Sequence, residues 1–225
     1  MTIKTINPST EEVIQEYENI TKEELVDKTR KSKEAFEEWK KDPHKRADHI
    51  YAFASELRKN KDNLAKTATI EMGKAIKESK AEVEKCAWAM EYFADNAKIF
   101  LTDDIINTEA RKSNVVFEPI GVIASLMPWN FPYWQALRFA APCLMAGNTI
   151  VLKPSSVTMQ CGIEMEKTFT KIGLPDNVFQ TIIASSKEAD YLIDSENVSA
   201  VTFTGSVTVG SKVAQMATSK IKKPF

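Results

Sequence analysis

Three short polar turns hold the residues whose types and spacing could do chemistry. In the first, residues 127–132 are MPWNFP, so two prolines make the turn rigid and Pro132 suits the first position of a helix. At the carboxyl end of a strand, the NH2 of the Asn130 carboxamide could donate to an oxyanion that develops during a reaction. The alternative is that Asn130 only caps the following helix, and the spacing leaves both roles open.

The second turn places a lysine before small hydroxyl residues, because residues 153–156 are KPSS. An ammonium group at a strand end can bind the hydroxyls of a ribose, or a phosphate attached to one of them. The alternative is a solvated Lys153, followed by a helix for which Ser156 or Thr158 serves only as the cap.

The third turn contains a glycine and begins a helix, because residues 204–210 are TGSVTVG. Gly205 would let a ligand approach the backbone closely, and Ser206 with the helix N-terminus offers O–H and N–H donors to a pyrophosphate. A Thr-Gly-Ser helix start is also common where nothing binds. The three turns are more informative together than singly, because each of them follows the end of a predicted strand.

The elements that must position these turns alternate between short apolar runs and helical stretches, the pattern of a parallel α/β sheet with flanking helices. We predict strands at Val122–Leu126, Thr149–Leu152, Val178–Ile182 and Ala200–Phe203. We predict helices at Pro132–Ala146, Thr158–Ile172 and Lys187–Ile193, and a last one from near Ser206. Such sheets bind ligands at the carboxyl ends of their strands. No G-x-G-x-x-G or P-loop sequence follows any of these strands, so the three turns must carry the hypothesis.

Helices rich in Lys and Glu precede this region, and their charge indicates that they lie on the surface. Residues 21–24, TKEE, form a capping box that starts the first of them. We predict helices at residues 21–41, 43–72 and 74–100, the second interrupted near Asn60 and ended by Gly73. Residues 103–119 fit neither the helices nor the sheet, and we interpret them as a projecting β-hairpin.

Composition points to a small-molecule partner. Lys and Arg total 30 against 31 Asp and Glu, and the net charge of -1 favours neither nucleic acid nor a membrane surface. The polar N-terminus and the lack of any run of about 18 apolar residues indicate a protein that is neither exported nor membrane-spanning, and we expect it in the cytoplasm.

The cysteines have no metal-ligand spacing, so we expect no metal site. We interpret all three as small buried residues, not nucleophiles: Cys86, Cys143 and Cys161.

Longer motifs around these turns resemble the aldehyde dehydrogenase superfamily. The resemblance runs from the INPST opening at residues 6–10 to the last residue. The stretches PWNFPYWQALRFAAPCLMAGN at residues 128–148 and VTFTGSVTVG at residues 201–210 look most like the succinate-semialdehyde dehydrogenase branch. The resemblance implies an oxidoreductase that converts an aldehyde, succinate semialdehyde, to the carboxylic acid with NADP or NAD.

The resemblance also implies a role for each residue of the turns. Asn130 would support the oxyanion of the covalent aldehyde adduct, while Met127 and Trp129 would line the nicotinamide side. Lys153 and Ser156 would meet the adenosine ribose, and Ser206 the pyrophosphate. We count four neighbouring residues of the same turns as further cofactor contacts: Pro128, Ser155, Gly205 and Val209.

Fold and cofactor choice follow from the same resemblance. The implied fold is Rossmann-like, with an N-terminal helical part at residues 1–102, an oligomerisation hairpin at residues 103–120 and a dinucleotide-binding part at residues 121–225, so we expect a homo-oligomer. Many relatives that prefer NAD carry a glutamate where this chain has Ser156. Without that carboxylate, repulsion of a 2′-phosphate is absent, and we expect NADP to bind at least as well as NAD.

The family's catalytic cysteine motif and its glutamate motif, E-L-G-G, belong beyond Phe225 and are not in these 225 residues. We therefore expect this chain to be the cofactor-binding half of the enzyme, without the catalytic domain and inactive alone. The alternative is a non-catalytic module that binds a dinucleotide or assembles through its hairpin. Coding sequence downstream of Phe225 that contains E-L-G-G would favour the enzyme half.

Overall fold

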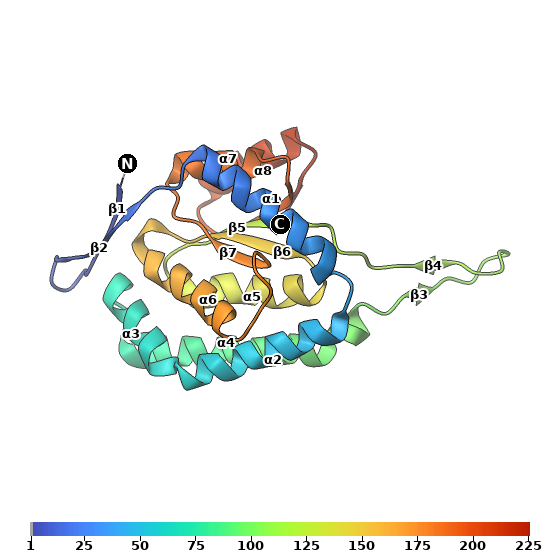
Figure 1. Ribbon diagram of the computed structural model, residues 1–225, viewed down its shortest axis with the longest axis horizontal. Coiled ribbons are helices and arrows are strands. Elements are labelled where there is room, and N and C mark those ends of the chain that lie inside the picture. Colours follow the sequence, from blue (N-terminus) through green and yellow to red (C-terminus); the bar gives the residue numbers. More distant parts are fainter. Residues whose placement is uncertain (1) are drawn as a thin grey trace.

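A five-stranded parallel sheet organises the second half of the computed structural model, which describes residues 2–225 (Figure 1). Its strands are β5 (Val122–Leu126), β6 (Thr149–Lys153), β7 (Phe179–Thr181), β8 (Val198–Phe203) and β9 (Lys223–Pro224), in the order β7-β6-β5-β8-β9. All neighbouring strands are parallel. The four predicted strands are confirmed. The fifth, β9, was not predicted, because its two residues have no apolar pattern.

Helices connect these strands, as the alternating pattern predicts. They are α5 (Pro132–Met145), a 3-10 turn η1 (Ser156–Thr158) leading into α6 (Met159–Lys171), α7 (Ser186–Asp194) and α8 (Val207–Ser219). Gly147 and Gly173, which follow α5 and α6, have φ values of 95° and 77°. Both conformations favour glycine, which explains why the helices end at these points.

The N-terminal helices also follow their local signals. They are α1 (Lys22–Trp39), α2 (Pro43–Lys59), α3 (Lys61–Met72) and α4 (Ile76–Phe100). Thr21 and Glu24 form the predicted capping box, Asn60 separates α2 from α3, and Gly73 ends α3 with φ at 74°. Within residues 2–225, every helix is too short or too polar to cross a membrane.

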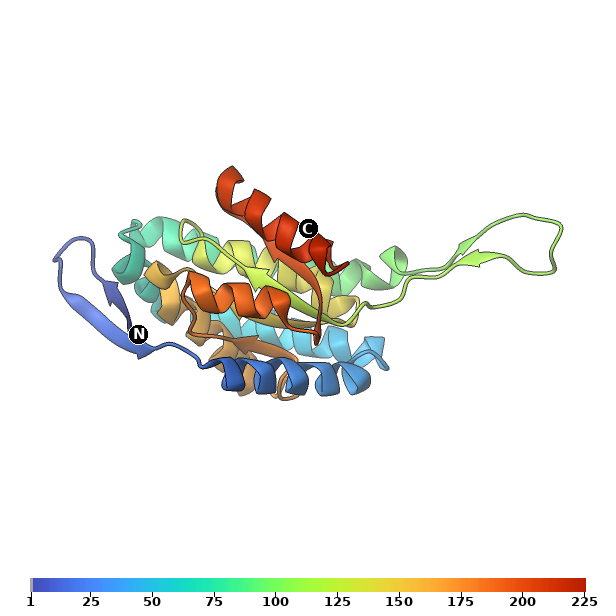
Figure 2. The same cartoon turned by 90° about the horizontal axis from the view of Figure 1, so that it is seen from above.

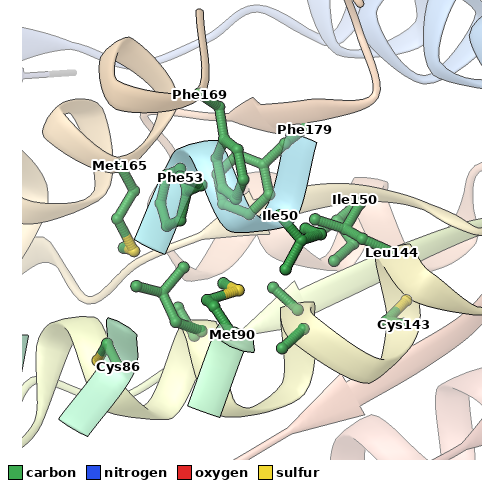
Figure 3. Close-up of a cluster of buried hydrophobic side chains, with 14 of the residues drawn as sticks. Ile50, Phe53, Cys86, Met90, Cys143, Leu144, Ile150, Met165, Phe169 and Phe179 are labelled. Atoms are coloured by element: carbon green, nitrogen blue, oxygen red, sulfur yellow. The ribbon is translucent and has the colours of Figure 1, made fainter. Parts of the chain in front are cut away.

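Alternating side chains of the sheet pack against two helical layers (Figure 1). On one face, Ile123 and Ile150 join a large core with α2, α3, α4, α5 and α6. Figure 3 shows part of this core, in which the Phe169 ring of α6 stacks on Phe53 of α2 with centroids 3.6 Å apart. On the other face, Val122 and Ala124 pack with residues of α1, α7 and α8. The sheet is therefore buried on both faces, as a parallel sheet requires.

Two β-hairpins extend from opposite ends of the molecule (Figure 2). The predicted one contains β3 (Asp104–Ile105) paired with β4 (Asn114–Val115). The other pairs β1 (Thr2–Ile6) with β2 (Val13–Glu18) in antiparallel register. The description of residues 1–102 as helical is therefore wrong for residues 2–18. The alternation of β1 is short and has a single buried face, with only Ile3 and Thr5 buried, so the sequence carried little signal for it.

Candidate functional site

The sheet register brings the three polar turns together. Leu126 of β5 pairs with Lys153 of β6 on one side and with Phe203 of β8 on the other. Beyond the strands, the Met127 N–H donates to the Lys153 carbonyl at 3.2 Å and the Thr204 N–H donates to the Leu126 carbonyl at 3.1 Å. The chain runs from β5 through β6 to β7 on one side and then returns to β8 on the other. This reversal makes the carboxyl ends of β5 and β8 the expected ligand crevice of the sheet.

A cleft of about 340 Å³ lies at this edge. Seven of the predicted cofactor residues line it: Met127, Pro128, Lys153, Ser155, Gly205, Ser206 and Val209. Apolar side chains of α7 and α8, among them Ile193 and Val213, line it as well. An ion pair between Asp190 of α7 and Lys212 of α8, with an O–N distance of 2.7 Å, joins the two helices beside the cleft.

Lys153 is half-buried at the end of β6 and is not a fully solvated lysine. Its Nζ donates to the Pro154 carbonyl at 3.1 Å, and it forms no ion pair within residues 2–225. Burial lowers the pKa of Lys153, and the nearby Glu188 carboxylate opposes that shift. The cleft therefore contains a partly desolvated ammonium group whose one protein acceptor is a neutral carbonyl, which is a suitable arrangement for a polar or anionic ligand.

The serines of the second turn have separate surroundings. The Ser155 side chain accepts from the Val157 N–H at 3.3 Å and caps η1. Ser156 is exposed and lines a neighbouring cavity, to which Lys153 also contributes. Of the two caps that the sequence offers for the following helix, Thr158 occupies the N-cap position of α6, although its side chain makes no cap hydrogen bond.

Asn130 does not cap α5. The residue at the N-cap is Phe131, which makes no side-chain cap hydrogen bond. The Asn130 Oδ1 accepts from the Phe131 N–H at 3.1 Å, and its NH2 makes no hydrogen bond within the part of the chain that the structure describes. Asn130 is exposed, two residues after Pro128, which lines the cleft. Of the two roles that the spacing left open, helix capping is excluded and the NH2 remains free to donate.

Buried glutamates from the N-terminal helices cap the two helices that follow the first and second turns. Glu82 of α4 accepts from the N–H groups of Tyr133 and Trp134 in the first turn of α5, both at 2.9 Å. Glu71 of α3 accepts from Gln160 and Cys161 in the first turn of α6, at 2.8 and 2.9 Å. Each carboxylate therefore satisfies two backbone donors at a helix N-terminus and interacts favourably with its positive end.

A buried lysine neutralises one of these glutamates. Lys74 forms an ion pair with Glu82, and the two side chains are 9% and 1% exposed. The Lys74 Nζ also lies 3.9 Å from the centroid of the Phe131 ring, directly after Asn130. The sequence does not mark Glu71 and Glu82 as buried, because the charge of their Lys- and Glu-rich region indicates a surface location. Their partners lie more than 50 residues away, and no local pattern marks them.

The remaining predicted residues differ in their placement. Trp129 is 51% exposed and does not line the cleft. Ser206 is the N-cap of α8, where its Oγ accepts from the Val209 N–H at 3.4 Å. A Cβ at Gly205 would overlap the Phe203 ring. Glycine is thus required there for packing within the chain, whatever approaches from the cleft.

All three cysteines are buried in the core, as predicted (Figure 3 labels two of them). Burial raises the pKa of each thiol, and for Cys161 the nearby Glu71 carboxylate raises it further. None of the three lines the cleft. A buried thiol with a raised pKa is a poor nucleophile, because the reactive species is the thiolate.

Comparison with known proteins decides the family. The aldehyde dehydrogenase family model matches residues 1–225. The chain belongs to the aldehyde dehydrogenase family. A probable succinate-semialdehyde dehydrogenase [NADP(+)] of Synechocystis is 38% identical over 224 residues, covering 99% of this chain and 49% of that protein. Succinate-semialdehyde dehydrogenase [NADP(+)] 1 of Mycobacterium tuberculosis is 37% identical, with coverage of 99% and 50%.

Solved aldehyde dehydrogenases have the same fold. The succinic semialdehyde dehydrogenase of Streptococcus pyogenes in complex with NADP+ superposes with a TM-score of 0.95 at 30% identity, covering 99% of this chain and 49% of that one. The betaine aldehyde dehydrogenase of Staphylococcus aureus in complex with NAD+ gives a TM-score of 0.94 at 28% identity, covering 99% and 45%. The chain spans about half the length of the aldehyde dehydrogenases that it matches.

Proposed function

We propose that this chain is the dinucleotide-binding part of an aldehyde dehydrogenase that oxidises an aldehyde to the carboxylic acid with NADP or NAD. The observation that carries the proposal is the cleft where the three turns meet, at the switch point of a parallel sheet. Family membership and relatives that are named for NADP(+) support it.

The residues of the cleft fit a dinucleotide. The ammonium of Lys153 has only a neutral carbonyl as acceptor, so it is available to the hydroxyls or phosphate of the adenosine ribose, beside Ser156. Ser206 and the first N–H groups of α8 suit the pyrophosphate. Between α7 and α8, Ile193 and Val213 offer an apolar surface to the adenine ring. Met127, Pro128 and Trp129 would then lie on the nicotinamide side.

Asn130 is the residue through which this chain would take part in the chemistry. A bound NADP or NAD supplies the hydride acceptor. The unpaired NH2 of Asn130 donates to the aldehyde oxygen as negative charge develops on it, and such preorganised donors stabilise the transition state. We infer succinate semialdehyde as the substrate from the relatives that are named for it.

Assembly into a homo-oligomer through the hairpin β3–β4 completes the proposal. Each strand has two residues, and Ile105 is 80% exposed, with Val115 and Val116 also exposed. A two-stranded ribbon with apolar side chains in water has little stability of its own. Pairing with a second copy of the chain would bury these side chains, and sedimentation velocity at several protein concentrations would measure that association.

Fluorescence titration of the 225-residue chain with NADP and with NAD tests the cofactor site, because Trp129 directly follows Met127 and Pro128, which line the cleft. We expect saturable binding of both, with NADP at least as tight as NAD, and weaker binding by a Lys153→Met variant. The control is Lys80→Gln, which alters an exposed ion pair between α4 and Asp62 of α3. Absence of saturable binding would refute the dinucleotide site, and a tenfold preference for NAD would refute the cofactor choice alone.

A further inference from the structure

The N-terminal hairpin is fixed against the turn that carries Ser156. Ile3 of β1 and Tyr17 of β2 pack on Met159 at the start of α6 in a small buried cluster. The Tyr17 hydroxyl donates to the Gln160 Oε1 at 2.9 Å. These contacts join residues that are more than 140 positions apart, and they place β1 beside the second turn.

A cavity of about 320 Å³ lies between β1, the second turn and the start of α7. It is lined by Ile3, Lys4, Lys153, Ser156, Ser185 and Ser186. Lys153 also lines the cleft proposed for the dinucleotide, so the two spaces adjoin at this residue. A ligand group near Lys153 would therefore enter a cavity that a second cationic residue, Lys4, also lines from a different part of the chain.

The charge of this cavity favours a phosphate. Two lysines and three serines are among the residues that line it, and no Asp or Glu is among the described residues that do so. Glu188 is nearby, but its carboxylate accepts from the Ser185 N–H at 3.0 Å in the capping box of α7. Lys4 pairs with Glu16 across the hairpin at 2.7 Å, and both side chains are 51% exposed. Such an exposed pair is weak and can exchange its partner.

We propose that Lys4 is a specificity residue that binds the 2′-phosphate of NADP together with Lys153 and the Ser156 hydroxyl. This inference rests on the proposed dinucleotide site and adds the N-terminal hairpin to it. A ribose phosphate carries between one and two negative charges near neutral pH, so a second cation adds to its affinity and leaves a ribose with free hydroxyls unaffected. Lys4 therefore acts on the choice between NADP and NAD.

Calorimetric titration with 2′,5′-ADP and with 5′-AMP tests this role, because the two probes differ only in the 2′-phosphate. A Lys4→Gln variant should bind 2′,5′-ADP about three- to tenfold more weakly, somewhat above the range of a single exposed charge pair, and bind 5′-AMP unchanged. Lys4→Arg should retain most of the affinity. Glu16→Gln should bind 2′,5′-ADP more tightly, since it removes the competing carboxylate.

The control Lys80→Gln should change neither affinity, and equal thermal melts would show that the variants remain folded. The Lys4 effect should shrink as salt is raised, because the site is open to solvent. If Lys4→Gln altered neither probe, or weakened both equally, the role of Lys4 would be refuted while the dinucleotide site stood. If the unchanged chain bound neither probe, the dinucleotide site itself would be refuted, and the role of Lys4 with it.

Discussion

Replacing Glu82 with alanine should strongly destabilise the fold, although Glu82 lies in a segment rich in charge. The change removes the acceptor of two backbone N–H groups at the start of α5, each bonded at 2.9 Å. It also leaves the ammonium of Lys74, whose side chain is 9% exposed, without its carboxylate. Both losses act at the helix that follows Asn130.

The unpaired lysine and the two lost hydrogen bonds both contribute to the expected cost. Removing one partner of a buried ion pair typically costs about 3–5 kcal/mol, and each lost hydrogen bond to a charged group contributes about 1.5–3 kcal/mol. These losses share one carboxylate and are not additive, so we expect about 4–5 kcal/mol in total. Typical domains have only about 5–15 kcal/mol of stability. The variant would therefore lose about a quarter or more of its free energy of unfolding.

Urea unfolding followed by tryptophan fluorescence measures this loss as a change in midpoint at a constant m-value. Adding Lys74→Met to Glu82→Ala should recover part of the stability, because it removes the unpaired charge. Asp62→Asn, which breaks the exposed pair with Lys80, is the control and should leave the midpoint unchanged. A loss below about 1 kcal/mol for Glu82→Ala would refute the inference that this carboxylate caps α5 and neutralises Lys74.

Four further outcomes are expected. Lys153→Met should raise the melting temperature of the free chain, because burial lowers the pKa of Lys153 and so disfavours its charged form. The same change should lower NADP affinity by more than about tenfold. Unchanged affinity would contradict the binding role of Lys153. Burial raises the pKa of Glu71 above 4.5, so its contribution to stability is present below pH 4.5 and is lost as pH rises through the folded-state pKa. The Glu71→Gln variant has no carboxyl group to titrate at this position. Its urea midpoint should therefore rise relative to that of the unchanged chain as the pH increases from 4.5 to neutrality. A difference between the two midpoints that stays constant with pH would argue against the raised pKa. In an aldehyde dehydrogenase containing this segment, Asn130→Ala should lower turnover on the order of 100- to 1000-fold with cofactor affinity little changed; a loss below about threefold, with chemistry rate-limiting, would argue against the oxyanion role. The thiols of Cys86, Cys143 and Cys161 should resist a disulfide reagent in the native chain. In denaturant all three should react. Fast reaction of any one of them in the native chain would show an exposed thiolate.

Local chemistry in the sequence was sufficient to predict most of the elements. The capping box at Thr21 and the glycine after Met72 mark helix ends, since both act through neighbours within four residues. The apolar run at 122–126 was recognisable as a strand because a parallel strand is buried on both faces. The grouping of the three turns at one edge follows from strand–helix alternation alone, because parallel strands all end on the same side.

Tertiary structure decided what depends on partners far along the chain. The return of the chain from β7 to β8 places the crevice beside β5, and no local pattern encodes that strand order. Glu71 and Glu82 belong to a segment whose charge indicated surface, yet each is buried because its carboxylate meets the donors of a helix more than 50 residues later. Lys4 and Ser156 line one cavity only because Ile3 packs on Met159. Local sequence determines where an element begins and ends. Whether a charged side chain can be buried depends on the hydrogen-bond donor or counter-ion that the folded chain places next to it from a distant part of the sequence.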